Sequence, residues 1–206
     1  DPETTELTIA SQGVVDIEDR AGVVGMHKTF TPLWLCEAPT PLTTPGKALR
    51  KLAAQIKPKP DENDLARMHR LSDLIGEKVA YKSGHTDATT TAEQALVAGH
   101  GVCQDHAHIM IATARLLGLP ARYISGYLIY LFAAVHGAAH AWAEVWVDDL
   151  GWIGFDVSNA ICPDDRYVRV AVGRDYRDAA PIHGIRQGSG TEDLHVALNI
   201  QSQTGQ

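Results

Sequence analysis

The clearest pattern along the chain is an apolar helical stripe between residues 103 and 117. Apolar side chains recur there at the i, i+3, i+4, i+7 spacing of one helix face, at Ala107, Met110, Ile111, Ala114 and Leu117. Gly118 and Pro120 follow directly, as is typical of a helix C-terminus. The pattern therefore predicts a packed helix that begins at Cys103 and ends before Gly118.

Three more helices are predicted upstream, at about residues 44–56, 61–79 and 91–99. Pro45 stands at the expected first helical position of the first helix, where its missing N–H costs nothing. Asp61 or Asn63 is the expected N-cap of the second helix. Thr91 and Gln94 have the spacing of a capping box for the third.

The second half of the chain has the pattern of β-strands. Residues 140–147 alternate strictly, with His140, Trp142, Glu144 and Trp146 on one face and smaller apolar residues on the other. A turn at 148–151 leads to a returning strand of a hairpin. Strands are expected near residues 121–130, 140–147, 152–157, 167–172 and 194–200. Helices followed by strands favour an α+β fold over a doubly wound parallel one.

The first 44 residues have a weaker pattern. Residues 6–11 and 14–17 are predicted to form two short strands. Residues 21–44 contain several prolines and are predicted to be a connecting segment that lies over the core, anchored by Phe30, Leu33 and Trp34.

Composition narrows the class of protein. The chain has 206 residues, 45% of them hydrophobic and 21% charged, as expected for one globular domain with an appendage. The formal net charge of −7 argues against a nucleic-acid partner, and no apolar run is long enough to predict a membrane span. Three widely spaced cysteines predict no disulfide framework, so we expect a reducing, cytoplasmic compartment.

Cys103 is the first candidate for chemistry. A thiol at a helix start faces unpaired backbone N–H groups and the positive end of the helix dipole, and both favour the thiolate. Cys103 is therefore a candidate nucleophile. Cys36 and Cys162 have no such setting and are expected to be small buried hydrophobic residues.

A nucleophilic thiol needs a base, and His140 is the best candidate. His140 lies within the alternating strand, whereas His136 precedes it beside Gly137 and is expected in a loop. If residues 148–150 form an odd-numbered hairpin loop, Asp156 lies opposite Trp142 and diagonal to His140. Their side chains then originate roughly 5–8 Å apart, within reach of a carboxylate–imidazole hydrogen bond.

A metal site is an alternative role for the histidines around Cys103. His100, Cys103, His106 and His108 are close in sequence. However, His108 is rotated by about 200° from His106 on a helix, so the two cannot share a metal without leaving the helix. The sequence also lacks a calcium-loop pattern, and no metal or cofactor is predicted.

Three stretches resemble the signature blocks of the bacterial transglutaminase-like superfamily, whose members are often described as candidate cysteine proteases. The blocks are Gly-Val-Cys-Gln-Asp-His-Ala-His at 101–108, His-Ala-Trp-Ala-Glu-Val-Trp at 140–146 and Phe-Asp-Val-Ser-Asn at 155–159. The resemblance implies that Cys103 is the nucleophile, His140 the base and Asp156 the acid. It also implies a papain-like core, in which a helical half carrying the cysteine packs on an antiparallel sheet.

The resemblance extends over about residues 45–206, which we expect to be the enzyme core. Members of this family usually have a β-rich domain before the core, so residues 1–44 are expected to be the remnant of that domain with a connecting segment. The chain begins with Asp1-Pro2 and not with methionine, which favours a fragment or a processed form.

The expected chemistry is acyl transfer on amide bonds of a peptide or protein substrate, through a thioester on Cys103. The backbone N–H of Cys103 is one expected oxyanion donor, and Tyr81 is the candidate for the second. Hydrolysis is the first choice of reaction. Protein-glutamine transglutaminase activity and a non-catalytic peptide-binding module remain as alternatives, because the sequence does not determine how well the pocket excludes water.

Overall fold

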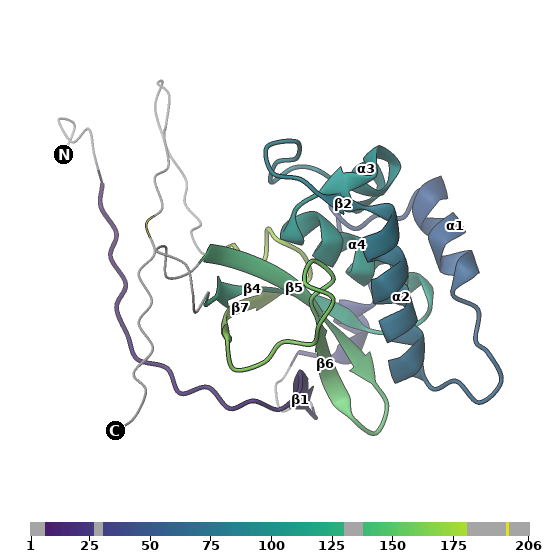
Figure 1. Cartoon of the computed structure of the whole chain (residues 1–206), viewed down its shortest axis with the longest axis horizontal. Coiled ribbons are helices and arrows are strands. Elements are labelled where there is room, and N and C mark those ends of the chain that lie inside the picture. The colour runs from purple at the N-terminus through teal and green to yellow at the C-terminus, as the bar shows by residue number, and fades with distance from the viewer. Residues whose placement is uncertain (1–6, 27–30, 130–137, 181–196, 198–206) are drawn as a thin grey trace.

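The computed structural model describes residues 7–26, 31–129, 138–180 and 197. Within these residues, an antiparallel sheet forms one layer and the α-helices form the other (Figure 1). The predicted α+β class, with the cysteine helix packed against an antiparallel sheet, is confirmed.

The sheet has five strands in the order β1-β6-β5-β4-β7, and all of its pairings are antiparallel. The strands are β1 (Val23–Gly25), β4 (Ala121–Leu128), β5 (Ala138–Val147), β6 (Gly151–Phe155) and β7 (Tyr167–Gly173). A separate parallel pair joins β2 (Ala80–Tyr81) to β3 (His100–Gly101). The predicted strand at 194–200 lies, apart from one residue, outside the described residues.

The helices are α1 (Lys47–Gln55), α2 (Asp64–Lys78), α3 (Ala92–Ala98) and α4 (Cys103–Leu116). Helix α4 contacts β4 and β5 on one side and the other three helices on the other, so it lies between the sheet and the rest of the helical layer (Figure 1). This position explains why its side chains from Asp105 to Ala114 are all buried. The predicted stripe of α4 is therefore confirmed, although apolar neighbours surround more of the helix than one face.

Local sequence signals set most helix ends as predicted. Asn63 caps α2 by accepting from the Ala66 N–H at 2.9 Å. Both hydrogen bonds of the Thr91–Gln94 capping box are present at the start of α3. Gly118 follows α4 with a positive φ of 83°, the conformation that favours glycine after a helix.

The start of α1 was predicted wrongly, because a distant residue determines it. The helix begins at Lys47, so Pro45 precedes the N-cap and is not the first helical residue. The Glu93 carboxylate, from α3, accepts from the N–H groups of Gly46, Ala48 and Leu49 at 3.1, 2.7 and 3.0 Å. These contacts satisfy the first N–H groups of α1 and fix where the helix begins.

The two strands predicted near the N-terminus are not formed in the described residues 7–20. Apolar side chains there, such as Leu7 and Val14, are largely exposed, and a strand needs a neighbouring ladder to be stable. The observed strand is β1, which pairs with the edge of the sheet at β6. Trp34 is also exposed and is not an anchor, and the predicted anchor Phe30 lies outside the described residues. Cys36 and Leu42 are the buried apolar residues of this segment.

Both faces of β5 are buried. Ala141, Ala143 and Val145 belong to the main core that α4 covers. On the opposite face Trp142 packs with Tyr167 in a second apolar cluster. Glu144 on that face is fully buried and forms ion pairs with Arg122 and Arg169, so its role is structural.

Gly126 on β4 makes room for this second cluster. A side chain at Gly126 would place its Cβ 2.7 Å from the ring of Trp142. The glycine therefore allows the indole to lie across β4, next to the residues of the predicted site. None of the helices in the described ranges has the length and apolar character needed to cross a lipid bilayer.

We expect His108, in the core face of α4, to make the fold sensitive to acid. The ring is fully buried, and its Nε2 accepts from the Tyr176 N–H at 3.1 Å. Burial lowers the pKa of His108 from 6.5 to about 4. The neutral ring therefore stabilises the fold above pH 6.5, and this contribution, about 3 kcal/mol, is lost as the pH falls from 6.5 towards 4.

Urea unfolding at several pH values measures this effect. His108→Gln keeps an acceptor for Tyr176 but cannot become protonated, so its unfolding free energy should fall less between pH 6.5 and 4. His85→Gln removes an exposed histidine and serves as the control. Equal slopes for wild type and His108→Gln would contradict the assignment.

Candidate active site

Cys103 is the first residue of α4, as predicted. The first hydrogen bond of the helix runs from the His106 N–H to the Val102 carbonyl at 3.1 Å. The N–H groups of residues 103–105 therefore have no acceptor within the helix. The thiol thus lies where the helix presents donors and the positive end of its dipole.

The carboxylate of Asp105, two residues after Cys103, stabilises the start of α4. The Asp105 Oδ2 atom accepts from the Val102 N–H at 2.8 Å and from the Thr86 hydroxyl at 2.7 Å. Val102 has no side-chain acceptor, so Asp105 alone caps this end from within the helix. The Cβ of any larger residue at position 101 would lie 2.6 Å from the Asp105 Cβ, which explains the glycine there.

The β5–β6 hairpin brings His140 to Asp156. Val147 pairs with Gly151 and Ala143 pairs with Phe155, so the loop has the three residues 148–150. This odd loop places Asp156 on the same face of the sheet as His140, in the predicted register. The His140 Nε2 atom lies 2.7 Å from the Asp156 Oδ2 atom, and both side chains are buried.

Three further groups hold the Asp156 carboxylate. Asn159 Nδ2 and the Tyr167 hydroxyl each donate to Oδ2 at 2.6 Å, and the Ser158 N–H donates to Oδ1 at 3.0 Å. The sequence pattern predicts no role for any of these residues. An aspartate side chain commonly accepts from the N–H two residues later, so the Ser158 contact is typical of the sequence around Asp156. Tyr167, in contrast, comes from β7, and no local sequence pattern predicts its contact with Asp156.

These contacts set the charges of the pair. Burial by itself would lower the pKa of His140, but the hydrogen bonds to Asp156 and Cys103 and the charges of both raise it to about 9. Burial would raise the pKa of Asp156, but the hydrogen bond and charge of His140, with Tyr167 and Asn159, lower it. The geometry therefore favours an imidazolium–carboxylate pair at neutral pH.

Cys103 is a second partner of the same ring. Its side chain interacts with the His140 ring and contributes to the raised pKa of the histidine. Since Nε2 contacts Asp156, Nδ1 is the ring nitrogen left for the sulfur. The structure thus brings Cys103, His140 and Asp156 together, from α4, β5 and the residue after β6.

Tyr81 lies beside the start of the cysteine helix. It is on β2, directly opposite Gly101 of β3, and its ring is half exposed. Its ring centroid is 6.2 Å from that of His106. Tyr81 is therefore a neighbour of the residues around Cys103, and its role as an oxyanion donor stays a proposal.

The other histidines near Cys103 point to separate partners. The His106 Nε2 atom contacts the Val79 carbonyl and Nδ1 contacts the Ser158 hydroxyl, while His100 Nδ1 contacts the Ala98 carbonyl. No group of three or more metal-ligating side chains occurs in the part of the chain that the structure describes. His136 lies outside the described residues.

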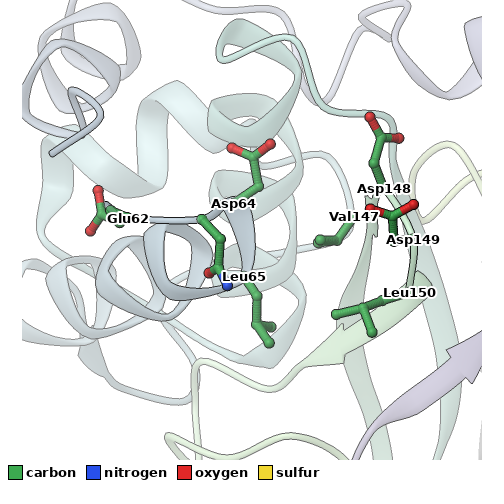
Figure 2. A pocket seen from close by; sticks show the side chains of 8 residues that line it. Glu62, Asp64, Leu65, Val147, Asp148, Asp149 and Leu150 are labelled. Carbon is green, nitrogen blue, oxygen red and sulfur yellow. The ribbon is translucent and has the colours of Figure 1, made fainter. Parts of the chain in front are cut away.

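A surface hollow elsewhere on the molecule is lined by carboxylates. It lies between the start of α2 and the β5–β6 turn, with Glu62 and Asp64 on one side and Asp148 and Asp149 on the other (Figure 2). Glu62 is paired with Arg70, and Asp64 is paired with Arg67. The hollow shares no lining residue with the Cys103 site, so it adds nothing to the chemistry there.

Comparison with known proteins supports one family. The family model of the transglutaminase-like superfamily matches residues 50–157, a range that includes Cys103, His140 and Asp156. An uncharacterised protein of Mycobacterium leprae is 33% identical over 213 residues, which covers 95% of this chain and 74% of that protein. A protein-glutamine gamma-glutamyltransferase of Pseudomonas aeruginosa is 30% identical over 76 residues, 31% of this chain and 11% of that protein.

A solved structure supports the same core. A candidate cysteine protease from Cytophaga hutchinsonii superimposes with a TM-score of 0.63 at 30% identity, over 79% of this chain. The match spans 55% of that longer chain. The predicted papain-like, transglutaminase-like core is therefore confirmed.

Replacing the carboxylate should reverse the pKa shift of His140. In Asp156→Asn the ring stays buried but loses the carboxylate charge, so the pKa should fall by about 2 units or more. An NMR titration of the ring protons measures it. Because the folded pKa of about 9 exceeds 6.5, the stabilisation present below pH 6.5 should be lost as pH rises through 9 in wild type.

Asp149→Asn is the matched control, since this exposed residue in the same hairpin has a positive φ of 69° that asparagine tolerates. A His140 pKa that is unchanged in Asp156→Asn would show that the carboxylate does not set the charge of the ring.

Proposed function

Because this chain belongs to the transglutaminase-like superfamily, we propose that it is a cysteine enzyme that transfers the acyl group of an amide through a thioester on Cys103. One observation carries the proposal: the buried 2.7 Å contact of His140 with Asp156, beside a thiol at a helix start. Such a set supplies a nucleophile, a base and an orienting acid.

In the first half-reaction, His140 takes the Cys103 proton, or holds it already as a thiolate–imidazolium pair. The sulfur forms a bond to the carbonyl carbon of the amide, and the carbonyl oxygen becomes an oxyanion. The carbon–nitrogen bond then breaks, and the imidazolium gives its proton to the departing amine. Asp156 keeps the ring oriented and stabilises its charge.

Two donors are proposed for the oxyanion. The Cys103 N–H has no acceptor within the helix and points outward from its start. Tyr81, opposite Gly101, is proposed as the second donor. Loss of one such donor typically costs about 3–4 kcal/mol in the transition state.

Hydrolysis is the proposed second half-reaction. His140 removes a proton from water, the hydroxyl oxygen bonds to the thioester carbon, and the carbon–sulfur bond breaks to release the acid. The similarity to the C. hutchinsonii protein, described as a candidate cysteine protease, supports this choice. A peptide or protein is the proposed substrate.

Amine transfer is the second candidate. The resemblance to the P. aeruginosa protein-glutamine gamma-glutamyltransferase favours it, because 76 residues of the two chains align at 30% identity. A primary amine would then replace water as the acceptor. A peptide-binding module without turnover is the third candidate, and it would have no use for an activated thiol.

Labelling of the thiol tests the first step. Iodoacetamide at pH 6 should modify Cys103 to about one label per chain. The reason is that an ion-paired thiolate reacts with iodoacetamide at this pH, whereas an ordinary protonated thiol reacts very slowly. Intact mass measures the label. Cys103→Ala should abolish it, whereas Cys162→Ala should retain it. Labelling that persists in Cys103→Ala would place the reactive thiol elsewhere.

Product masses distinguish the three functions. A library of glutamine-containing peptides is incubated with and without a primary amine and analysed by mass spectrometry. Cleavage would support the protease, and deamidation without an amine would support an amidase. Incorporation of the amine would identify a transglutaminase. No change, despite a reactive Cys103, would favour the binding module.

A further inference from the structure

We propose that His106 and Ser158 are positioning residues, which tie the turn around Asp156 to the helix that carries Cys103. The inference rests on the proposed function, because it assigns a role within that site. Ser158 contacts His106 through its hydroxyl and Asp156 through its backbone. The contacts therefore lead from the acid back to α4.

His106 has a defined tautomer in this arrangement. Its Nε2 atom is 2.9 Å from the Val79 carbonyl, which only accepts, so Nε2 carries the proton. Its Nδ1 atom is 2.8 Å from the Ser158 hydroxyl, which then donates to the neutral ring. Burial lowers the pKa of His106, which favours this neutral form. The ring thus joins α4 to the end of α2 and to the turn after β6.

Ser158 belongs to a tight turn that surrounds the carboxylate. Asp156 and Ile161 exchange two backbone hydrogen bonds at 2.9 and 3.2 Å, which close the turn. Inside it, the N–H of Ser158 donates to Asp156 Oδ1. A displacement of Ser158 would therefore move a donor of the carboxylate that orients His140.

The contacts form a closed ring around the site. Cys103 interacts with His140, His140 hydrogen-bonds to Asp156, and Asp156 accepts from the Ser158 N–H. The Ser158 hydroxyl contacts His106 of α4, one helical turn after Cys103. Strand β6 ends at Phe155, so the sheet fixes the face of Asp156 but not the turn beyond it. The contact between Ser158 and His106 attaches this turn to α4.

Ser158→Ala is the sharpest test, because it removes only the hydroxyl. The Ser158 N–H and the bond from His106 to Val79 both remain, so the support of α2 by His106 is unaffected. Ser158→Thr restores the hydroxyl and serves as the rescue variant. Thr113→Val, also in α4, removes a buried hydroxyl that has no hydrogen-bond partner and is the matched control.

The first readouts need no substrate. In Ser158→Ala the pKa of His140, measured by NMR, should fall by about 0.5–1 unit, since its partner is less well held. Alkylation of Cys103 at pH 6 should slow by about three- to tenfold. Ser158→Thr and Thr113→Val should match wild type in both measurements. With a cleavable peptide, kcat should fall in Ser158→Ala with little change in KM.

A wild-type pKa and labelling rate in Ser158→Ala would overturn the inference, even if its melting temperature fell. A wild-type protein that is labelled at Cys103 but turns over no peptide would instead contradict the proposed function, and the pKa comparison would still decide the role of Ser158. If Ser158→Ala does not fold, Ser158→Gly, which also removes the hydroxyl and keeps the backbone N–H, is measured in its place. A His140 pKa that stays at the wild-type value there would also overturn the inference.

Discussion

The contact between His140 and Asp156 is the constraint on which the arrangement of the site depends. Asp156 is 1% exposed, and a buried carboxylate costs free energy unless donors surround it. The donors come from β5, from the turn after β6 and from Tyr167 on β7. The pair thus requires three parts of the sheet to meet, and it forms only when the hairpin has an odd loop.

Carboxylates also fix the helical half of the molecule. Glu93 caps α1 from α3, and Asp105 caps the start of α4 while it accepts from Thr86. Each carboxylate satisfies N–H groups that a helix start would otherwise leave without partners. The position of the Cys103 thiol therefore depends on Asp105, just as the orientation of the His140 ring depends on Asp156.

Aromatic rings surround the base on the side of the second cluster. Trp142 stacks on the His140 ring at 6.4 Å between centroids, and Tyr167 meets it edge-on at 5.9 Å. Both residues are almost fully buried, so they exclude water from this side of the imidazole–carboxylate pair. Exclusion of water strengthens the electrostatic contact between His140 and Asp156. It would also help the proposed thioester to react with one acceptor in preference to another.

The sequence by itself determined the features that depend on local spacing. The cap at Thr91 and the helix start at Cys103 follow from capping and stripe patterns, and the cap of α2 was narrowed to Asp61 or Asn63. The parity of the hairpin loop placed Asp156 on the face of His140. Tertiary structure decided what depends on partners distant in the chain. Glu93 caps α1 from α3, so the helix starts later than the local sequence predicts. Residues 7–20 form no strand, because a strand needs a hydrogen-bonded neighbouring strand that the sequence pattern cannot supply. Tyr167 and the contact of His106 with Ser158 became visible only when separate elements packed together, since hydrogen bonds between distant residues leave no periodic signal in the sequence.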